Sequence, residues 1–569
     1  MPDWFNKLQN VINSCQETEE QAVDQQPDVA CEEWMILSDR LQPFENVTVD
    51  SNIEVDWHQD RSRYTDAQIG EMPSWIKSKK EMLADVLFHE HEVSDIDSLN
   101  EMQKLAYNIV KSHFEDNSVD KDPLCLIVVG VGGTGKSYLI NAMRNLLQAK
   151  CAVTATTGKA AFNIRGTTLH SLLRLPVGSR GQSVLKGQTL SRFQQSLHHI
   201  DYIIIDEYSM LGQNSFGWVD KRCKQATART DQVFGGKSLI LVGDPGQLPP
   251  VADKPLYHPQ PSNGVAEQGY QVYRMFDNVV KLTINERVQG TDLKQKQFRE
   301  LLLRLRKGDS TETDWKFLLS RQPTNVPNIA DFGDAIRLFY SNEEVAEYNY
   351  KKLRELQQPI ATINAQHSSA VAKNMSSDDM SGLKTVIFLA KGAKVMLTMN
   401  LWPSVGLCNG ATGRVVDFIY ETNSRPPLLP IAVIVQFDNY RGPSLSDEYP
   451  SYVPICPITI SCLSENSVHE RQQLPLKLAW ALTIHKSQGL TLVKAWINIG
   501  KTERTSGITY VAISRMRNPV SFVIEPMTLE RLTSIRSSLA MKLKLKEEAR
   551  LDILAKQTHS TFCAKYISF

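Results

Sequence analysis

Residues 124–147 constrain the fold of this chain more than any other stretch of its sequence. Residues 124–129 (LCLIVV) form a wholly apolar run, as expected for a strand buried on both faces of a parallel sheet. The loop GVGGTGKS at 130–137 fits the pattern G-x-x-x-x-G-K-[ST], and apolar residues at helical spacing follow it. Because a chance glycine turn would rarely lie between such a strand and such a helix, the stretch predicts a loop that holds a phosphate chain.

The residues of this loop have separate tasks. The glycines let the backbone approach the phosphates, the Lys136 ammonium binds the β- and γ-phosphates, and the Ser137 hydroxyl ligates Mg²⁺. We therefore expect the chain to bind a nucleotide together with Mg²⁺. The expected nucleotide-binding residues of the loop are Gly130, Gly132, Gly133, Thr134, Gly135, Lys136 and Ser137.

Length and composition limit the classes of protein to consider. A prior of about 150 residues per domain suggests roughly three to five units in the 569 residues. No apolar run approaches the roughly 20 residues that cross a bilayer, and residues 1–13 lack the features of a signal peptide. The nine cysteines contain no C-x-x-C pair, which indicates reduced thiols. We expect an intracellular protein without a membrane partner.

The net charge of zero conceals an uneven distribution. Residues 1–95 carry 21 acidic and 7 basic side chains, whereas the remainder carries 42 acidic and 56 basic ones. A basic body suits a polyanionic partner, and an acidic leader can compete with that partner for the same surface. A solvated, partly disordered leader is the alternative, and the sequence leaves both open.

Strand-like and helical segments alternate after the leader. Ser98 and Glu101 have the spacing of a capping box, which predicts the start of the first helix. The alternation that follows predicts a parallel sheet with helices on both faces. Strands of this sheet are expected at 151–157, 202–206 and 238–244.

A second α/β block opens near Val279 and is interrupted by a different kind of sequence. The interruption consists of short β-like runs between Pro/Gly turns, which indicates a small inserted barrel. The runs of the insert lie at 394–397, 412–420, 431–437 and 457–462. Strands of the resumed block are expected at 478–484, 493–499 and 520–524, and residues 368–382 are expected to form a loop.

Acidic residues end two of the strand-like runs. Asp206 and Glu207 follow YIII, where one carboxylate can hold the magnesium ion and its neighbour can orient and deprotonate an attacking water. We assign the metal to Asp206, together with Ser137, and the water to Glu207. In GDPGQLPPV, Asp244 is expected beside the same phosphates and Gln247 is expected to sense the γ-phosphate. Since the guanine motif N-K-x-D is missing, ATP is the expected nucleotide.

Phosphoryl transfer also needs positive charge on its transition state, and an arginine supplied across a cleft adds on the order of 10³ to 10⁵ in rate. Arg287 follows VVKLTINE at the start of the second block, and Arg515 lies in TYVAISRMR near its end. Either one alone would more often be a surface residue. We expect both to complete a catalytic site when the two blocks close around the nucleotide.

An ordered set of segments resembles the motifs of the superfamily 1B helicases, most closely those of the Pif-one (petite integration frequency) DNA helicases. The resemblance covers about residues 96–526. Its DEYSM and QLPP variants separate this group from helicases with a DExQD motif, and the RecD-type helicases share the general plan. The segments are LNEMQKLAY, GVGGTGKS, TATTGKAA, GTTLHSL, IIIDEYSML, GDPGQLPPV, LTINER, LTIHKSQGLTL and TYVAISR.

This resemblance implies ATP-driven 5′-to-3′ movement along single-stranded DNA, with strand separation at a fork. It implies that Gln103 reads the adenine edge and that Gly489 lies at the nucleotide. Trp402 is a candidate for stacking on a base, although a tryptophan in a β-rich insert is more often core. The implied DNA-binding residues are Thr157, Gly158, Thr168, His170, Ser171, Lys486, Ser487 and Gln488.

The expected architecture is α/β, with two RecA-like P-loop domains on parallel sheets and a small SH3-like β-barrel inserted in the second. The KLKLKEEAR segment near the C-terminus indicates a solvated helix face rather than a nuclear signal. The expected parts are an acidic N-terminal region at 1–95, a first domain at 96–275 with a wedge insert at about 168–197, a second domain at 276–391 and 475–530, the barrel at 392–474, and a helical tail at 531–569.

The site residues and the resemblance together imply an ATP-dependent 5′-to-3′ DNA helicase that uses Mg²⁺ and acts on single-stranded and forked or structured DNA. We expect it to be competent as a monomer, to lie in the nucleus or alternatively in a mitochondrion, and to serve repair, recombination or telomere maintenance. A first alternative is an ATP-driven translocase or remodeller, or a transposon-derived helicase module, without processive unwinding. A second alternative is a non-catalytic nucleotide-gated nucleic-acid-binding module, which the complete set of catalytic residues argues against.

Overall fold

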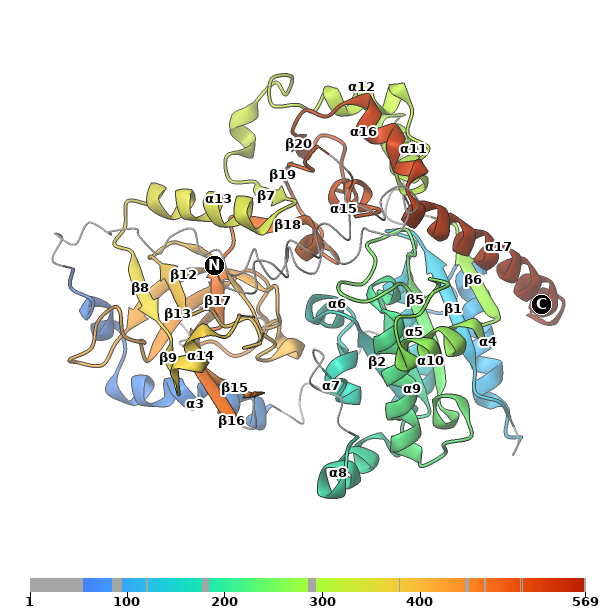
Figure 1. The fold of residues 1–569 in the computed structure, drawn as a ribbon, viewed down its shortest axis with the longest axis horizontal. Helices are drawn as coiled ribbons and strands as arrows, with labels where there is room; N and C mark the ends of the chain where they lie inside the picture. Colours follow the sequence, from blue (N-terminus) through green and yellow to red (C-terminus); the bar gives the residue numbers. More distant parts are fainter. Residues whose placement is uncertain are drawn as a thin grey trace, which may run out of the picture. The chain divides into compact units, whose positions relative to one another are not determined.

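A six-stranded parallel sheet carries the phosphate-binding loop (Figure 1). The computed structural model that shows it describes residues 55–83, 95–118, 121–176, 184–284, 293–377, 379–445, 450–464, 467–501, 503 and 505–566. The strand order is β3-β2-β4-β5-β1-β6, which confirms the predicted parallel sheet. The strands are β1 (Cys125–Gly130), β2 (Cys151–Ala155), β3 (Thr167–Thr168), β4 (Tyr202–Asp206), β5 (Ser238–Gly243) and β6 (Asn278–Leu282).

Alternation along β1 supplies a core to each face of this sheet. Leu126 and Val128 belong to one buried apolar cluster, which α4 and α5 cover. Ile127 and Val129 belong to another, which α9 and α10 cover. The residues divide in this way because successive strand residues point to opposite faces. We call this sheet and its helices the first lobe. The helices are α4 (Glu101–Glu115), α5 (Lys136–Leu147), α6 (Gly158–Asn163), α7 (Leu169–Leu173), α8 (Gly187–Leu197), α9 (Gln213–Thr227) and α10 (Gly264–Arg274).

Two expectations about the edges of this lobe are corrected. The sequence predicted that Val279 opens the second block, but β6 pairs with β1 and completes the first sheet. Val279 packs in the same apolar cluster as Ile127, and Val280 packs in the same cluster as Val128. The first lobe therefore extends past residue 276. Helix α4 is capped by Asn100 rather than Ser98, since the Asn100 and Gln103 side chains each accept a hydrogen bond from the other's backbone N–H.

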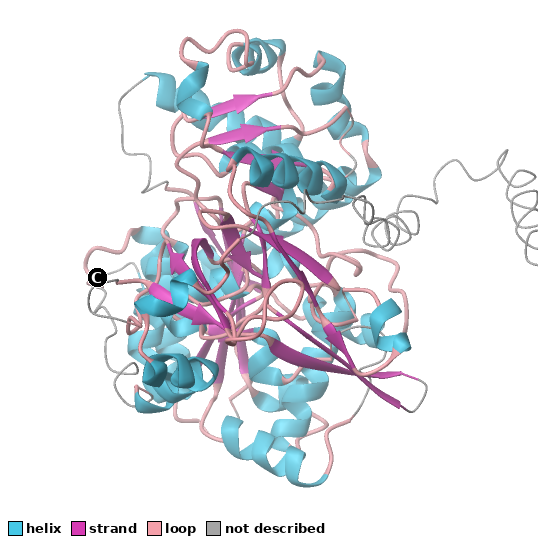
Figure 2. Cartoon of the chain, turned by 90° about the vertical axis from the view of Figure 1, so that its left-hand side faces the viewer, coloured by secondary structure: helices cyan, strands magenta, loops and turns pink. Residues whose placement is uncertain are grey.

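The second lobe is built on a four-stranded parallel sheet of order β18-β7-β19-β20, and helices lie around it (Figure 2). Its parallel pairing confirms the predicted second α/β block, although the sequence did not mark β7. The strands are β7 (Ile336–Phe339), β18 (Ala481–Thr483), β19 (Ala495–Ile497) and β20 (Phe522–Ile524). The helices are α11 (Leu293–Lys307), α12 (Glu312–Leu319), α13 (Asn342–Glu355), α15 (Ile508–Ser514) and α16 (Leu529–Thr533).

The insert contains a five-stranded antiparallel sheet of order β14-β13-β12-β11-β17. Its strands are β11 (Lys394–Leu397), β12 (Thr412–Ile419), β13 (Ala432–Phe437), β14 (Tyr452–Ile455) and β17 (Leu476–Leu478). Closure of this sheet into an SH3-like barrel stays a prediction.

Two smaller sheets accompany the insert. The expected strand at 457–462 lies in a separate sheet of order β15-β16-β9, and the expected loop at 368–382 contains the short helix α14. The remaining elements are β8 (Ala361–Asn364), β9 (Gln366–His367), α14 (Ala370–Asn374), β10 (Val386–Leu389), β15 (Ile458–Ser464) and β16 (Ser467–Gln473), with β8 and β10 paired as a two-stranded sheet.

The described part of the leader is ordered against the insert. Helix α3 (Asp66–Met82) places Met72 beside Ile419 and Ile434 in one apolar cluster and Trp75 in another. The 3-10 helix just before it (Gln59–Arg63) ends at Arg63, whose guanidinium donates to the buried Asp417 carboxylate at 3.0 Å. Residues 55–83 are therefore part of the folded body.

The C-terminal helix α17 (Leu539–Tyr566) corrects the expectation for KLKLKEEAR. Lys544 and Glu547 are buried, and Leu551 joins the core of the first lobe, so one face of this segment is not solvated. None of the helices in the described part of the chain is both long and apolar enough to cross a lipid bilayer.

Candidate nucleotide site and DNA-facing residues

The phosphate-binding loop has the backbone that its glycines allow. Gly133 and Gly135 have φ angles of +93° and +76°, a region that side chains disfavour. A Cβ at Gly130 would lie 2.3 Å from the Thr134 hydroxyl oxygen, which itself donates to the Val131 carbonyl at 2.9 Å. The loop therefore turns tightly before α5 begins at Lys136, as the motif predicted.

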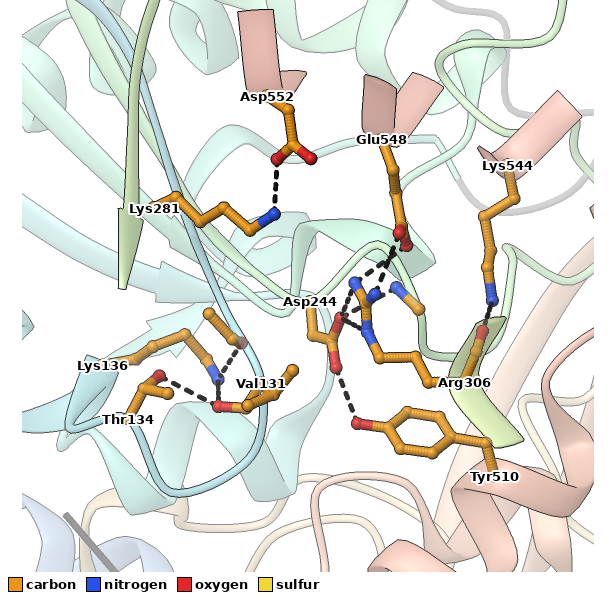
Figure 3. Close-up of polar contacts among 12 residues, drawn as sticks. Val131, Thr134, Lys136, Asp244, Lys281, Arg306, Tyr510, Lys544, Glu548 and Asp552 are labelled. Atoms are coloured by element: carbon orange, nitrogen blue, oxygen red, sulfur yellow. Dashed lines mark hydrogen bonds and ion pairs between the residues drawn. The ribbon is translucent and has the colours of Figure 1, made fainter. Parts of the chain in front are cut away.

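Lys136 and Gln103 both bond to the loop. The Lys136 ammonium donates to the carbonyl oxygens of Gly130 (2.8 Å) and Val131 (3.1 Å), so it folds back over the loop (Figure 3). The Gln103 side-chain amide donates to the Thr134 carbonyl at 3.1 Å and is buried. Gln103 thus joins the N-terminus of α4 to the loop, and its contact with adenine stays a prediction.

Asp206 and Glu207 lie at the end of β4 in an unusual electrostatic setting. Burial, and then the neighbouring Glu207 charge, raise the pKa of Asp206 to about 7, and Lys136 opposes this shift. Glu207 has a left-handed φ of +55°, and its backbone N–H donates to the Asp206 carboxylate at 2.9 Å. One buried Glu207 carboxylate oxygen has no hydrogen-bond partner among the described residues.

This donor set fits a magnesium nucleotide. A cation beside Asp206 would favour its ionised form and offset the repulsion from Glu207. Ser137 is exposed in the first turn of α5, where its hydroxyl is accessible to a ligand. Asp206 and Ser137 are hard oxygen donors, which is the ligand type that Mg²⁺ prefers.

Asp244, just after β5, connects the loop region to the second lobe. One of its carboxylate oxygens accepts from Arg306 Nε (2.9 Å) and Nη2 (2.7 Å) of α11, and the other accepts from the Tyr510 hydroxyl (2.9 Å) of α15 (Figure 3). Burial alone would raise the pKa of Asp244, but Arg306 and then Lys136 outweigh it and lower that pKa. Asp244 is therefore an ionised carboxylate that two elements of the second lobe hold.

The turn 244–247 is shaped by this contact. A Cβ at Gly246 would lie 2.2 Å from Arg306 Nε, so the arginine crosses the backbone where only a hydrogen fits. The Gln247 side chain is buried, and its carbonyl oxygen has no hydrogen-bond partner among the described residues. The role of Gln247 as a sensor of the γ-phosphate stays a prediction.

Of the two arginines predicted to complete the site, the structure describes Arg515 alone. Arg287 lies outside the described residues. Arg515 is buried, and its guanidinium donates to the Val511 carbonyl (2.9 Å) and the Ser514 hydroxyl (2.9 Å) of its own lobe. Its contact with a nucleotide stays a prediction, whereas Arg306 is the arginine that reaches the first lobe here.

The predicted DNA-binding residues divide by exposure. His170, Ser171 and Lys486 are exposed, whereas Ser487 and Gln488 are buried. Thr157 and Thr168 use their hydroxyl oxygens to cap α6 and α7. The contacts of this set with DNA stay predictions.

The same region contains contacts between the first lobe and the insert or the second lobe. A Cβ at Gly158 would lie 2.2 Å from the Asn400 side-chain oxygen, and the Asn163 amide donates to the Gly489 carbonyl at 3.3 Å. Trp402, the stacking candidate, is 2% exposed and belongs to the core of the insert.

Comparisons with known proteins show which family the sequence resembles. The sequence profile of the PIF1-like helicase family matches residues 98–316, and that of the DNA helicase Pif1 2B domain matches residues 382–418. The ATP-dependent DNA helicase PIF1 of Xenopus laevis is 33% identical over 398 residues, which are 68% of this chain and 57% of the relative. The chain belongs to the PIF1-like helicase family. The Pif1 helicase of Bdellovibrio bacteriovorus is 28% identical over 418 residues, 71% of this chain and 87% of the relative.

Solved Pif1 structures share the fold. One, from work on unwinding at forked double-stranded DNA, has a TM-score of 0.60 at 24% identity and covers 80% of this chain and 98% of its own. The Bacteroides Pif1 in complex with ADP-AlF3 and single-stranded DNA has a TM-score of 0.58 at 24% identity and covers 79% and 97%. The present PIF1-like chain spans between 56% and 62% of the length of the vertebrate relatives that it matches.

Sequence reasoning missed several residues of this PIF1-like site. Arg306 and Tyr510 hold Asp244, and Glu548 of α17 accepts from Arg306 Nη1 at 3.0 Å. Arg306 lies in the basic, amphipathic run RELLLRLRKGD, where it resembles its neighbours. Its low exposure of 7% is a property of the fold, and no local signal in the sequence marks it.

Proposed function

We propose that this protein is an ATP-dependent DNA helicase that moves 5′ to 3′ on single-stranded DNA and unwinds forked duplexes, with ATP and Mg²⁺ at the 130–137 loop. The observation that carries the proposal is the position of Asp244. It lies beside the phosphate-binding loop, yet Arg306 and Tyr510 of the second lobe hold it. A nucleotide that alters this contact changes how the lobes meet, as a motor requires. The names of the PIF1 relatives support the same activity.

Each residue of the chain has a defined task in this proposal. Lys136 leaves the carbonyls of Gly130 and Val131 and binds phosphate oxygens, while Glu207 orients the attacking water and accepts its proton. Ser137 and Asp206 would hold Mg²⁺, which would neutralise charge on the phosphates. The exposed His170, Ser171 and Lys486 suit contacts to the DNA backbone, which give affinity without sequence readout.

The decisive experiment measures ATP hydrolysis and strand displacement on 5′-tailed and 3′-tailed duplexes. We expect hydrolysis that single-stranded DNA stimulates and displacement of the 5′-tailed substrate alone. Lys136→Ala should lower the hydrolysis rate by about 10³-fold or more, because the transition-state charge loses its fixed cation, while binding to an oligonucleotide persists. DNA-dependent hydrolysis that Lys136→Ala leaves unchanged would refute the assignment.

The same assay tests the alternatives. Stimulated hydrolysis without strand displacement favours a translocase or remodeller, including a transposon-derived module. Oligonucleotide binding that ATP modulates, without hydrolysis, favours a nucleotide-gated binding module. We further propose that the protein is competent as a monomer and serves DNA repair, recombination or telomere maintenance in the nucleus, with the mitochondrion as the alternative compartment.

A further inference from the structure

Helix α17 joins the buried cores of the two lobes. Met541, near its start, lies in the apolar core of the second lobe, and Leu551, further along, lies in the core of the first. Beyond it, the Thr558 hydroxyl accepts a hydrogen bond from the Val279 backbone N–H at 2.9 Å, and α17 runs beside β6 (Figure 1). Because the helix is continuous, it forms one stiff strap across both lobes.

The strap holds Arg306 at two points. The Lys544 ammonium donates to the Arg306 backbone carbonyl at 2.7 Å, and the Glu548 carboxylate accepts from Arg306 Nη1 at 3.0 Å (Figure 3). The backbone and the guanidinium of Arg306 are thus both fixed by α17. Adjacent Glu547 instead accepts from the Tyr273 hydroxyl (2.7 Å) and from Arg550, so the two glutamates have different partners.

Arg306 bridges two carboxylates. Nε and Nη2 donate to Asp244, Nη1 donates to Glu548 at 3.0 Å, and Nη2 also lies 2.9 Å from the second Glu548 oxygen. Arg306, Asp244 and Lys544 are all buried, and the Glu548 side chain is 14% exposed. With two cations and two carboxylates the cluster is balanced, and loss of one carboxylate would leave a buried positive charge uncompensated.

We propose that Glu548 is a positioning residue for ATP turnover: its carboxylate fixes the Arg306 guanidinium so that it holds the Asp244 turn, and α17 thereby couples that turn to the second lobe. The inference rests on the proposed function, because the turn 244–247 carries Gln247, the expected γ-phosphate sensor. When Glu548 is lost, Nη1 has no fixed acceptor in this cluster. The guanidinium then rotates, and the turn loses its rigid link to the second lobe.

The variant Glu548→Gln tests this with little change in shape. We expect kcat for DNA-stimulated ATP hydrolysis to fall about tenfold while the KM for ATP stays within about twofold, as for loss of one charge-assisted hydrogen bond that positions rather than binds. Arg306→Lys should cost at least as much, and the double variant should lose no more than the worse single one, because both act through one contact. A wild-type kcat in Glu548→Gln, or additive losses in the double variant, would overturn the proposal.

Asp552→Asn is the matched control. It is another carboxylate-to-amide change on α17, and it removes the half-exposed pair with Lys281 of β6 without touching Arg306. We expect wild-type kcat and KM for this variant. If Asp552→Asn matched Glu548→Gln, general loosening of the strap would explain the loss, and the positioning role would be wrong.

A second readout does not depend on ATP hydrolysis. Hydrogen exchange in the nucleotide-free protein reports on the turn, whose Gly246 N–H donates to the Asp244 carboxylate at 2.8 Å. Peptides covering residues 244–250 should exchange faster in Glu548→Gln than in wild type or Asp552→Asn. Unchanged exchange there overturns the inference. If Lys136→Ala retained full hydrolysis, the proposed function would fail while the exchange result still decided the role of Glu548.

Discussion

At the scale of single residues, Lys544 is the buried cation whose proton should make stability depend on pH. Burial lowers its pKa from the ordinary 10.5 to about 8, an effect that Glu548 reduces and Arg306 reinforces. The unfolded chain therefore binds more protons than the folded one between about pH 8 and 10.5. In that window the Lys544 contribution to stability rises as pH rises.

This predicts a difference between wild type and Lys544→Met in urea unfolding at pH 8 and pH 10. The wild-type protein should gain on the order of 1 to 3 kcal/mol more than the variant over this interval, since each pKa unit corresponds to about 1.4 kcal/mol. Tyrosines and cysteines also titrate there, but they are common to both proteins and cancel in the comparison. Equal gains in the two proteins would show that Lys544 is not desolvated.

At the scale of elements, α3 offers a test of whether the leader supports the insert. Met72 is 1% exposed beside Ile419 and Ile434, whereas Met82 at the end of the same helix is 71% exposed. Met72→Ala should destabilise the insert by about 2–5 kcal/mol, and Met82→Ala should change stability by less than about 0.5 kcal/mol.

Hydrogen exchange of β12 and β13 would measure the effect of the two methionine variants. Faster exchange is expected in Met72→Ala alone. Similar exchange in both variants would mean that α3 lies on the insert without stabilising it.

The elements that carry the nucleotide site could be predicted because their signals are local. Apolar runs that end in glycine or a carboxylate gave β1, β4 and β5, and the ends of neighbouring parallel strands meet at one edge of a sheet. Lys136, Asp206 and Asp244 were therefore placed correctly relative to their strands. Helix α3 also has a local signal that was overlooked, since Ile69, Met72 and Trp75 recur at helical spacing and are all buried.

The contacts between distant segments could not be predicted, because local patterns in a single sequence do not reveal which distant residue a side chain contacts. Arg306 is 62 positions from Asp244 and 242 from Glu548, and it lies among other basic residues. The segment KLKLKEEAR is rich in charged residues, as a solvated helix face is. Its buried face results from contacts of α17 with both lobes. The edge strand β6 was assigned to the wrong block for the same reason.

At the scale of the whole molecule, the uneven charge predicts how DNA binding should respond to salt. Residues 1–54 carry 12 acidic and 2 basic side chains, whereas residues 96–569 are net positive. If the acidic segment competes with DNA, removing residues 1–54 should tighten oligonucleotide binding severalfold at about 50 mM salt. The gain should vanish near 300 mM, because the Debye length shortens. Equal affinity at low salt would instead favour a leader without an electrostatic role.

The strap also sets the order in which this chain can finish folding on the ribosome. The bond between Val279 and Thr558 joins residues 279 positions apart. At about 5–20 residues per second, synthesis of the intervening chain takes roughly 15 to 60 s. During that interval the first lobe lacks its contacts with α17, which include the apolar contacts of Leu551, the carboxylate partner of Tyr273 and the ion pair of Lys281. The apolar surface that Leu551 covers therefore stays uncovered by α17 until the C-terminal helix emerges.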